Sequence, residues 1–149
     1  MMTVMTSWRR QIILYISLLL STFCSFAEND MFLRARTLQR EGNYHEAVLL
    51  YKDILLQPVE PGILTEEKLH IYTEALIQLM NTFQSKGEPE ACVTTLQELF
   101  YVSPFLQKYG LRDYYSVMGY ALSRTDRMKE AEETILKALD IPLFHATPE

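Results

Sequence analysis

The side chains that most often carry out chemistry in proteins are few and scattered in this 149-residue sequence. No histidine has another histidine or a cysteine three or four positions away, the spacing that would place two metal ligands on one helical face; the histidines are His45, His70 and His145. No glycine-rich phosphate loop, nucleophile elbow or His-Glu-x-x-His motif occurs. We therefore predict no catalytic residue, no metal site and no cofactor.

Acidic residues gather in three groups, none of which is paired with a candidate base. The groups are Glu66-Glu67, Glu88-Glu90 and Glu130-Glu132-Glu133. Each lies in the first turn of a helix that the sequence predicts, where negative charge is favourable against the partial positive charge of the helix N-terminus. Helix stability explains these groups, so we assign none of them to acid–base catalysis.

The hydrophobic pattern around these residues predicts helices. Residues 33–56 have apolar or small side chains at a spacing of three to four, which indicates two amphipathic helices joined by a turn at Gly42-Asn43. Glycine permits the left-handed backbone that ends one helix, and Asn43 is expected to cap the next. Ala47, one turn before Tyr51, would let two helices approach closely while the aromatic ring fills the space beside them.

This unit resembles the tetratricopeptide repeat, whose signature combines a Gly-x-Tyr-x-x-Ala turn, a later aromatic residue and a closing proline. The residues that carry the resemblance are Gly42, Tyr44, Ala47, Tyr51 and Pro58. The first helix departs from the signature, because Met31 and Arg34 stand where tryptophan and leucine are usual. The resemblance implies an all-α fold of stacked antiparallel helical hairpins, arranged as a right-handed solenoid that binds a protein or a peptide.

Two further units follow the first. A helix is expected over Glu66 to Lys86, ended by Gly87, and a second from Pro89 to Ser103, in which Cys92 takes the place of Ala47. The third unit runs from about Leu111 to Leu139, and the turn at Asp126-Arg127 replaces the usual glycine. We expect about three hairpins, at residues 30–57, 66–103 and 111–140, in a repeat domain at 28–142. Residues 143–149 would be a tail or the start of a truncated next repeat.

Small and aromatic side chains at matching positions of these units are expected to pack the hairpins together. We predict this role for Ala35, Gly42, Tyr44, Ala47, Tyr51, Gly87, Cys92, Gly119, Ala131 and Ala138. The linker between the first two hairpins should be wide, because Pro58, Pro61 and Gly62 forbid a continuous helix there.

Residues 1–27 have the pattern of a secretory signal. Arg9-Arg10 precede an apolar stretch at 12–20, and Ser25-Phe26-Ala27 places small residues where a signal peptidase reads them, so we expect cleavage after Ala27. The alternative is a membrane anchor, but the apolar run ends within about 15 residues and a spanning helix needs ~20. The mature segment would then be exported to the periplasm without spanning the membrane.

Charge disfavours nucleic acid as a partner. The whole chain has a formal charge of −5, with 14 basic and 19 acidic residues. Cleavage would remove Arg9 and Arg10 but no acidic residue, which leaves a formal charge of −7. A chain of this sign repels a phosphate backbone.

The resemblance implies a concave groove lined by the first helix of each hairpin. The positions that line this groove in the tetratricopeptide family correspond in this sequence to Arg36, Gln39, Arg40, Ile77, Asn81, Gln84, Ser116, Tyr120, Ser123 and Arg124. Three arginines in an otherwise acidic chain would suit an acidic or carboxylate-bearing ligand. The alternative is that they are solvated charges paired with nearby glutamates. The Lys/Asn carboxylate clamp of chaperone-binding members is absent, because Phe32 and Arg36 occupy its first two places.

A secretory signal followed by irregular repeats resembles the extracytoplasmic part of Bacteroidetes sensor histidine kinases or of tetratricopeptide/helix-turn-helix regulators. This resemblance implies an input module, tethered to the inner membrane through a missing C-terminal part, and it leaves a homodimer open. No capping helix follows Pro142, which favours a longer parent protein. The alternative is a stand-alone periplasmic scaffold or assembly factor. A small hydrolase is disfavoured because no nucleophile and base can be nominated.

Overall fold

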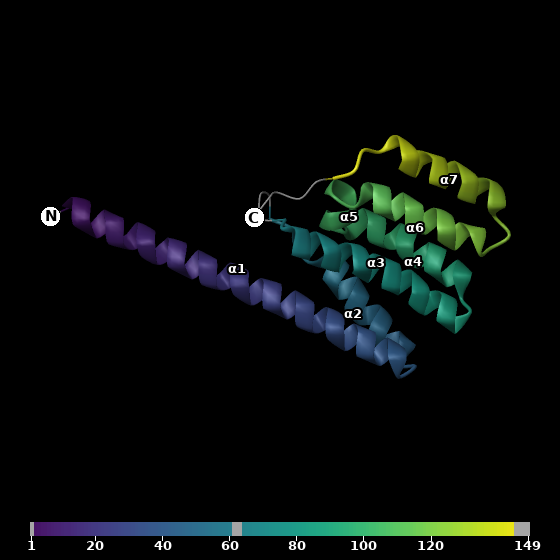
Figure 1. Ribbon diagram of the computed structural model, residues 1–149, viewed down its shortest axis with the longest axis horizontal. Coiled ribbons are helices and arrows are strands. Elements are labelled where there is room, and N and C mark those ends of the chain that lie inside the picture. The colour runs from purple at the N-terminus through teal and green to yellow at the C-terminus, as the bar shows by residue number, and fades with distance from the viewer. Residues whose placement is uncertain (1, 61–63, 145–149) are drawn as a thin grey trace.

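The computed structural model describes residues 2–60 and 64–144, which form seven helices and no strand (Figure 1). The predicted all-α helical-repeat fold is confirmed. The helices are α1 (Met2–Arg40), α2 (Tyr44–Leu56), α3 (Glu66–Lys86), α4 (Pro89–Val102), α5 (Pro104–Lys108), α6 (Leu111–Ser123) and α7 (Met128–Asp140). Pro61 and Gly62, expected to interrupt the chain between the first two hairpins, and His145 lie outside the described residues.

The helices form three antiparallel hairpins, α1/α2, α3/α4 and α6/α7, stacked side by side. The first helices contact one another in succession, α1 with α3 and α3 with α6. The second helices α2 and α4 also touch, and each of them contacts the first helix of the next hairpin. Helix α7 lies against α6, at the edge of the molecule opposite α1 (Figure 1).

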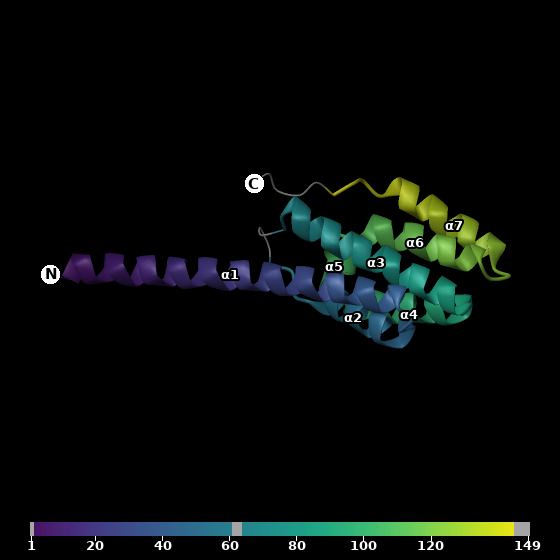
Figure 2. The same cartoon turned by 60° about the horizontal axis from the view of Figure 1, so that its bottom comes forward.

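Helix α1 joins the predicted leader to the first hairpin without a break. Its N-terminal part projects far beyond the stacked helices in both views (Figures 1 and 2), and the side chains of residues 8–20 are exposed. Within the described residues, no helix is both long and apolar enough to cross a membrane. The helix runs straight through Ala27, and cleavage after this residue stays a prediction.

Glu28, the residue after the predicted cleavage site, is buried. The Tyr72 hydroxyl of α3 donates a hydrogen bond of 3.1 Å to Glu28 Oε1. Glu28 Oε2 is also buried, and no residue of the described segments donates a hydrogen bond to it. The contact of Glu28 with Tyr72 therefore fixes α1 against the second hairpin.

The two glycine turns have the left-handed backbone that their positions require. Gly42 has a φ of 82° and Gly87 a φ of 71°. The expected side-chain cap at Asn43 is wrong, because this residue has a ψ of 62° rather than the extended value of a capping residue, and its side chain makes no cap hydrogen bond. Only its backbone takes part in the start of α2, since the Asn43 carbonyl accepts the first helical hydrogen bond from the Ala47 N–H at 3.1 Å.

The ten predicted packing residues differ in burial. Seven are buried, namely Ala35, Ala47, Tyr51, Cys92, Gly119, Ala131 and Ala138. Tyr44 is half-buried, and Gly42 and Gly87 are exposed in their turns. The contact at Gly119 is especially close, because a Cβ there would clash with the Ile135 side chain and lie 3.3 Å from the Ala131 carbonyl oxygen. Helices α6 and α7 can pack this closely only around a residue without a side chain.

Helix α5 was not expected, since the second hairpin was predicted to end at Ser103 and no helix was predicted between it and Leu111. Pro104 instead starts a new helix, where its missing N–H is harmless. The Ser103 hydroxyl accepts from the Leu106 N–H at 3.2 Å and donates to the Leu55 carbonyl at 2.6 Å. Phe105 is fully buried and stacks on the ring of Tyr72, with 4.8 Å between ring centroids. This short helix therefore packs on both of the first two hairpins.

Cys92 should react with thiol reagents only when the chain unfolds. The side chain is fully buried, and burial raises the pKa of the thiol to about 12, so the reactive thiolate is scarce at neutral pH. In a Cys24→Ser background, iodoacetamide labelling followed by intact mass should be slow in buffer and should accelerate through the urea transition. Equally fast labelling in buffer would contradict the burial of this helix contact.

Candidate binding face

The candidate binding face is the surface of α1, α3 and α6 that carries the ten predicted groove residues. All ten lie on these three helices or on the residue that ends α6. Exposed members are Arg40, Ser116, Tyr120 and Arg124, and half-buried members are Arg36, Gln39, Ile77, Asn81, Gln84 and Ser123. The three helices are neighbours, so one extended ligand could contact all of them.

At the α1 end of this face, Gln39 links three helices. The Tyr51 hydroxyl of α2 donates to Gln39 Oε1 at 2.7 Å, and Gln39 Nε2 donates to Gln78 Oε1 of α3 at 3.3 Å. Both polar atoms of Gln39 are therefore engaged in holding the first hairpin to the second. Gln78 was missed by the sequence analysis, because nothing in the helical periodicity distinguishes a glutamine that reaches a neighbouring helix.

Arg36 and Arg40 lie beside this link. Burial raises the pKa of Tyr51 to about 12, and the positive charges of Arg36 and Arg40 act in the opposite direction. Neither arginine is within ion-pair distance of a carboxylate of the described residues, and the same holds for Arg124. The alternative in which these three arginines are paired with nearby glutamates is therefore not found.

At the α6 end, Gln84 and Arg124 come together. Arg124 Nε donates to Gln84 Oε1 at 3.4 Å, across the gap between α3 and α6. Gln84 Nε2 is buried and has no acceptor within the described part of the chain. Gln84, Ser123 and Arg124 line an open depression of about 430 Å³, together with Gly87, Thr125 and Asp126 of the turns and Pro89 at the start of α4. Three of the ten predicted residues thus line one depression, where Arg124 is exposed and the Gln84 Nε2 donor is buried without an acceptor.

Asp113 and Thr73 add a polar contact between α3 and α6 that the sequence analysis did not predict. Burial raises the pKa of the Asp113 carboxyl, while a hydrogen bond from the Thr73 hydroxyl and the charge of Arg112 act in the opposite direction. This contact joins the same two helices as the Gln84–Arg124 pair. The layer of first helices is therefore held together partly by polar side chains.

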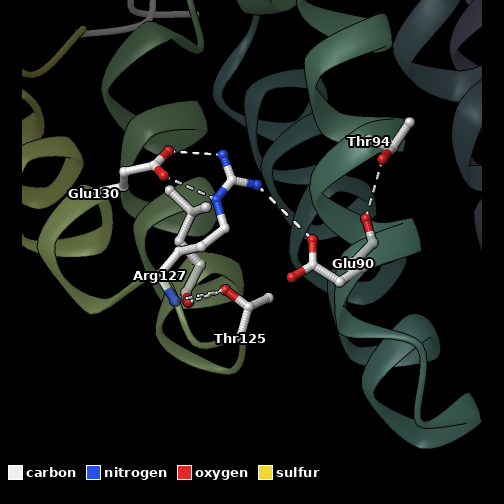
Figure 3. Close-up of polar contacts among 6 residues, drawn as sticks. Glu90, Thr94, Thr125, Arg127 and Glu130 are labelled. Atoms are coloured by element: carbon white, nitrogen blue, oxygen red, sulfur yellow. Dashed lines mark hydrogen bonds and ion pairs between the residues drawn. The ribbon is translucent and has the colours of Figure 1, made fainter.

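Arg127 has a different role from Arg124, although only two residues separate them. Figure 3 shows its guanidinium between two carboxylates. Arg127 donates to both Glu130 oxygens, at 3.0 and 2.6 Å, and lies 3.8 Å from Glu90 Oε2 of α4. The hydrogen bond from Arg127 lowers the pKa of the exposed Glu130 carboxyl. These contacts tie the α6–α7 turn to the second hairpin and leave the Arg127 charge neutralised.

Comparison with known families supports the repeat assignment. The sequence model of the tetratricopeptide repeat matches residues 113–143, which hold most of α6 and all of α7. No curated protein and no solved structure gives a significant match to the chain. A tetratricopeptide repeat is therefore found in the third hairpin, and repeats of this kind are typically protein-interaction modules without catalytic activity.

Proposed function

We propose that this chain is a non-catalytic repeat module that binds an acidic segment of a protein or peptide on the face of α1, α3 and α6. The observation that carries the proposal is the Gln84–Arg124 pair. Gln84 Nε2 is a buried donor without an acceptor in the described chain, and Arg124 is exposed without a carboxylate partner. A buried donor left unpaired costs about 1–3 kcal/mol, so a ligand oxygen that accepts from it, after the Gln84 side chain turns toward the depression, would recover that free energy.

A carboxylate suits this site better than a neutral acceptor. Its two oxygens can accept from the Gln84 amide and from the Arg124 guanidinium at once, and hydrogen bonds between charged groups are the stronger ones. Arg36 and Arg40 would contact a second acidic residue of the same ligand at the α1 end. Asp126 lines the Gln84–Arg124 depression and opposes an acidic ligand there, so it limits the affinity.

The proposal extends to location and to role in the cell. Arg9-Arg10 and the apolar stretch that follows support export across the inner membrane. In this setting the repeats would be the input region of a signal-transduction protein, in which ligand binding shifts the population of two arrangements of the hairpins. The alternative is a stand-alone periplasmic scaffold or assembly factor, and the absence of a nominated catalytic pair suits either role.

Binding can be tested with fluorescently labelled acidic peptides and a matched lysine peptide. We expect the acidic peptide to bind more tightly than the lysine peptide. Arg124→Gln and Arg36→Gln should each weaken binding of the acidic peptide by about tenfold, and Asp126→Asn should strengthen its binding. Arg34→Gln is the control, because Arg34 is exposed on α1 outside the candidate face. Equal affinity for both peptides, or an equal loss in the Arg34 variant, would refute the assignment of this face.

Cell fractionation followed by intact mass separates the two cellular roles. A membrane-bound species larger than this chain would support the input region of a receptor. A soluble periplasmic species that begins at Glu28 and is no larger than the rest of this chain would support the scaffold. A product that keeps residues 1–27 in the cytoplasm would overturn the export proposal, whatever the peptide experiment shows.

A further inference from the structure

Helix α7 exposes an apolar stripe at the edge of the molecule. The stripe contains Met128, Ile135 and Leu139, and Leu139 is 65% exposed. Leu136 flanks it and is also exposed. The side of α7 that carries Ala131 and Ala138 is buried toward α6, and Ile135 at the border of the stripe also contacts α6 beside Gly119. The rest of the stripe is a second face of the same helix.

The equivalent stripes of the first two hairpins are largely buried. When the hairpins are aligned on Ala47, Cys92 and Ala131, four positions of the second helix correspond in order from one hairpin to the next. They are Tyr44, Val48, Tyr51 and Leu55 in α2; Pro89, Val93, Leu96 and Phe100 in α4; and Met128, Glu132, Ile135 and Leu139 in α7. Tyr51, Leu55 and Leu96 are fully buried, whereas Ile135 is 42% exposed. The third stripe is therefore built like the first two, but apart from the contact of Ile135 with α6 it is left uncovered by the described residues.

The structure shows what kind of element covers such a stripe. Helix α3 lies against α2, and helix α6 lies against α4. Phe100 of the α4 stripe stacks on Tyr114 of α6, with 4.7 Å between ring centroids. Tyr51 of the α2 stripe also contacts Phe32 of its own hairpin, with 6.1 Å between ring centroids. At the α4 stripe the covering element is an amphipathic helix whose apolar side chains pack against those of the stripe. The same geometry on α7 would accept one further helix.

One position distinguishes the α7 stripe from the other two. Glu132 replaces Val48 and Val93, which are both buried in the interior hairpins. The Glu132 carboxylate is exposed and forms no ion pair with a residue of the described segments. A helix that covers the stripe would remove this charge from water, which is unfavourable unless the helix supplies a cation opposite it.

We propose that the α7 stripe docks an amphipathic helix of a partner protein, with apolar residues at a spacing of three to four and a lysine or arginine opposite Glu132. This surface lies on a different helix from the candidate binding face, so the two sites share no residue. A second copy of this chain is a poorer occupant. In an antiparallel pair of α7 helices, each Glu132 would face the apolar stripe of the other copy without a cation.

The test uses the full chain and two designed peptides of about 18 residues, because shorter isolated helices are marginal in water. Both peptides carry leucines at i, i+3, i+7 and i+10. One has a lysine in the centre of the leucine stripe and the other has a glutamate. Fluorescence anisotropy should show about tenfold tighter binding of the lysine peptide. Binding of neither peptide, or equal binding of both, would overturn the proposal.

Three variants locate the binding site. Leu139→Glu should weaken binding of the lysine peptide by at least about tenfold. Glu132→Val should remove the preference for the lysine peptide over the glutamate peptide. Leu49→Glu is the matched control, since Leu49 is an exposed leucine of α2 that lies off the equivalent stripe, and it should change nothing. An equal loss in the Leu49 and Leu139 variants would mean that the peptide binds elsewhere and would refute the proposal.

Two other occupants give distinct results. If sedimentation shows that the chain is a dimer and that Leu139→Glu converts it to a monomer, the stripe binds a second copy and the partner proposal fails. If the natural product is longer than this chain, Leu139→Cys can be introduced into this chain and into the longer product, and the new cysteine can be labelled in each. Protection in the longer chain only would mean that its own next helix covers the stripe, which would also overturn the proposal.

Discussion

Replacement of Ala47 by tryptophan is expected to abolish cooperative unfolding of the chain. Ala47 is fully buried on α2, which lies against both α1 and α3, and Ala35 of α1 is fully buried as well. An indole at this position would force the helices apart. Overpacking of a core typically costs about 1–3 kcal/mol, and more for the largest substitutions. A domain whose total stability is about 5–15 kcal/mol has little reserve against such a change.

Urea titration followed by far-ultraviolet circular dichroism would measure this effect. Leu49→Trp is the matched control, because Leu49 lies on the same helix and is exposed, so its replacement should leave the transition in place. If the Ala47 variant unfolds at the same urea concentration as the parent, the packing of the first hairpin described above is wrong.

Truncation of Phe105 to alanine is expected to lower the free energy of unfolding by about 3–5 kcal/mol, the usual cost of removing a large buried aromatic side chain. Phe105 is fully buried and stacks on Tyr72 of α3. Its loss would leave a cavity where α5 packs on the first two hairpins. The same helix contributes Leu106, which is also fully buried and cannot move outward to fill the space.

The measurement is again the free energy of unfolding in urea. Lys108→Ala is the control on the same helix, because Lys108 is exposed and its ammonium contacts only the ring of Tyr109 among the interactions of the described residues. A loss of less than about 1 kcal/mol in the Phe105 variant would mean that α5 is a peripheral turn rather than part of the core.

Local signals in the sequence were sufficient for the hairpins. Gly42 and Gly87 end helices through their own backbone conformation, and that conformation depends on the glycine itself. Helix α3 spans the same residues as the helix expected there, because Gly87 marks its end and the apolar spacing continues without interruption up to it.

Helix α5 and the capping at Asn43 could not be predicted in the same way. Proline both follows helices and starts them, so Pro104 is ambiguous until the burial of Phe105 is known. The Asn43 side chain is excluded from capping by its backbone angles, which the preceding turn fixes. Both outcomes depend on contacts or geometry beyond the residue concerned.

The candidate binding face was only partly accessible to sequence reasoning. Repeat positions indicate which helices contribute to it, and so they place Gln84 and Arg124 on α3 and at the end of α6. They do not reveal that these side chains meet, because the hydrogen bond between them links residues 40 positions apart. Gln78 was missed for the same reason, since its partner Gln39 lies on another helix.

The stacking of the hairpins makes the molecule close to a one-dimensional array, in which each unit is stabilised mainly by its neighbours. Helix α7 is packed chiefly against α6, so it can detach while the Tyr51–Gln39 link at the other end stays intact. Among the stacked helices, fraying should therefore begin at α7. A helix that docks on the α7 stripe would suppress this fraying. It would stabilise the last hairpin only while it is bound.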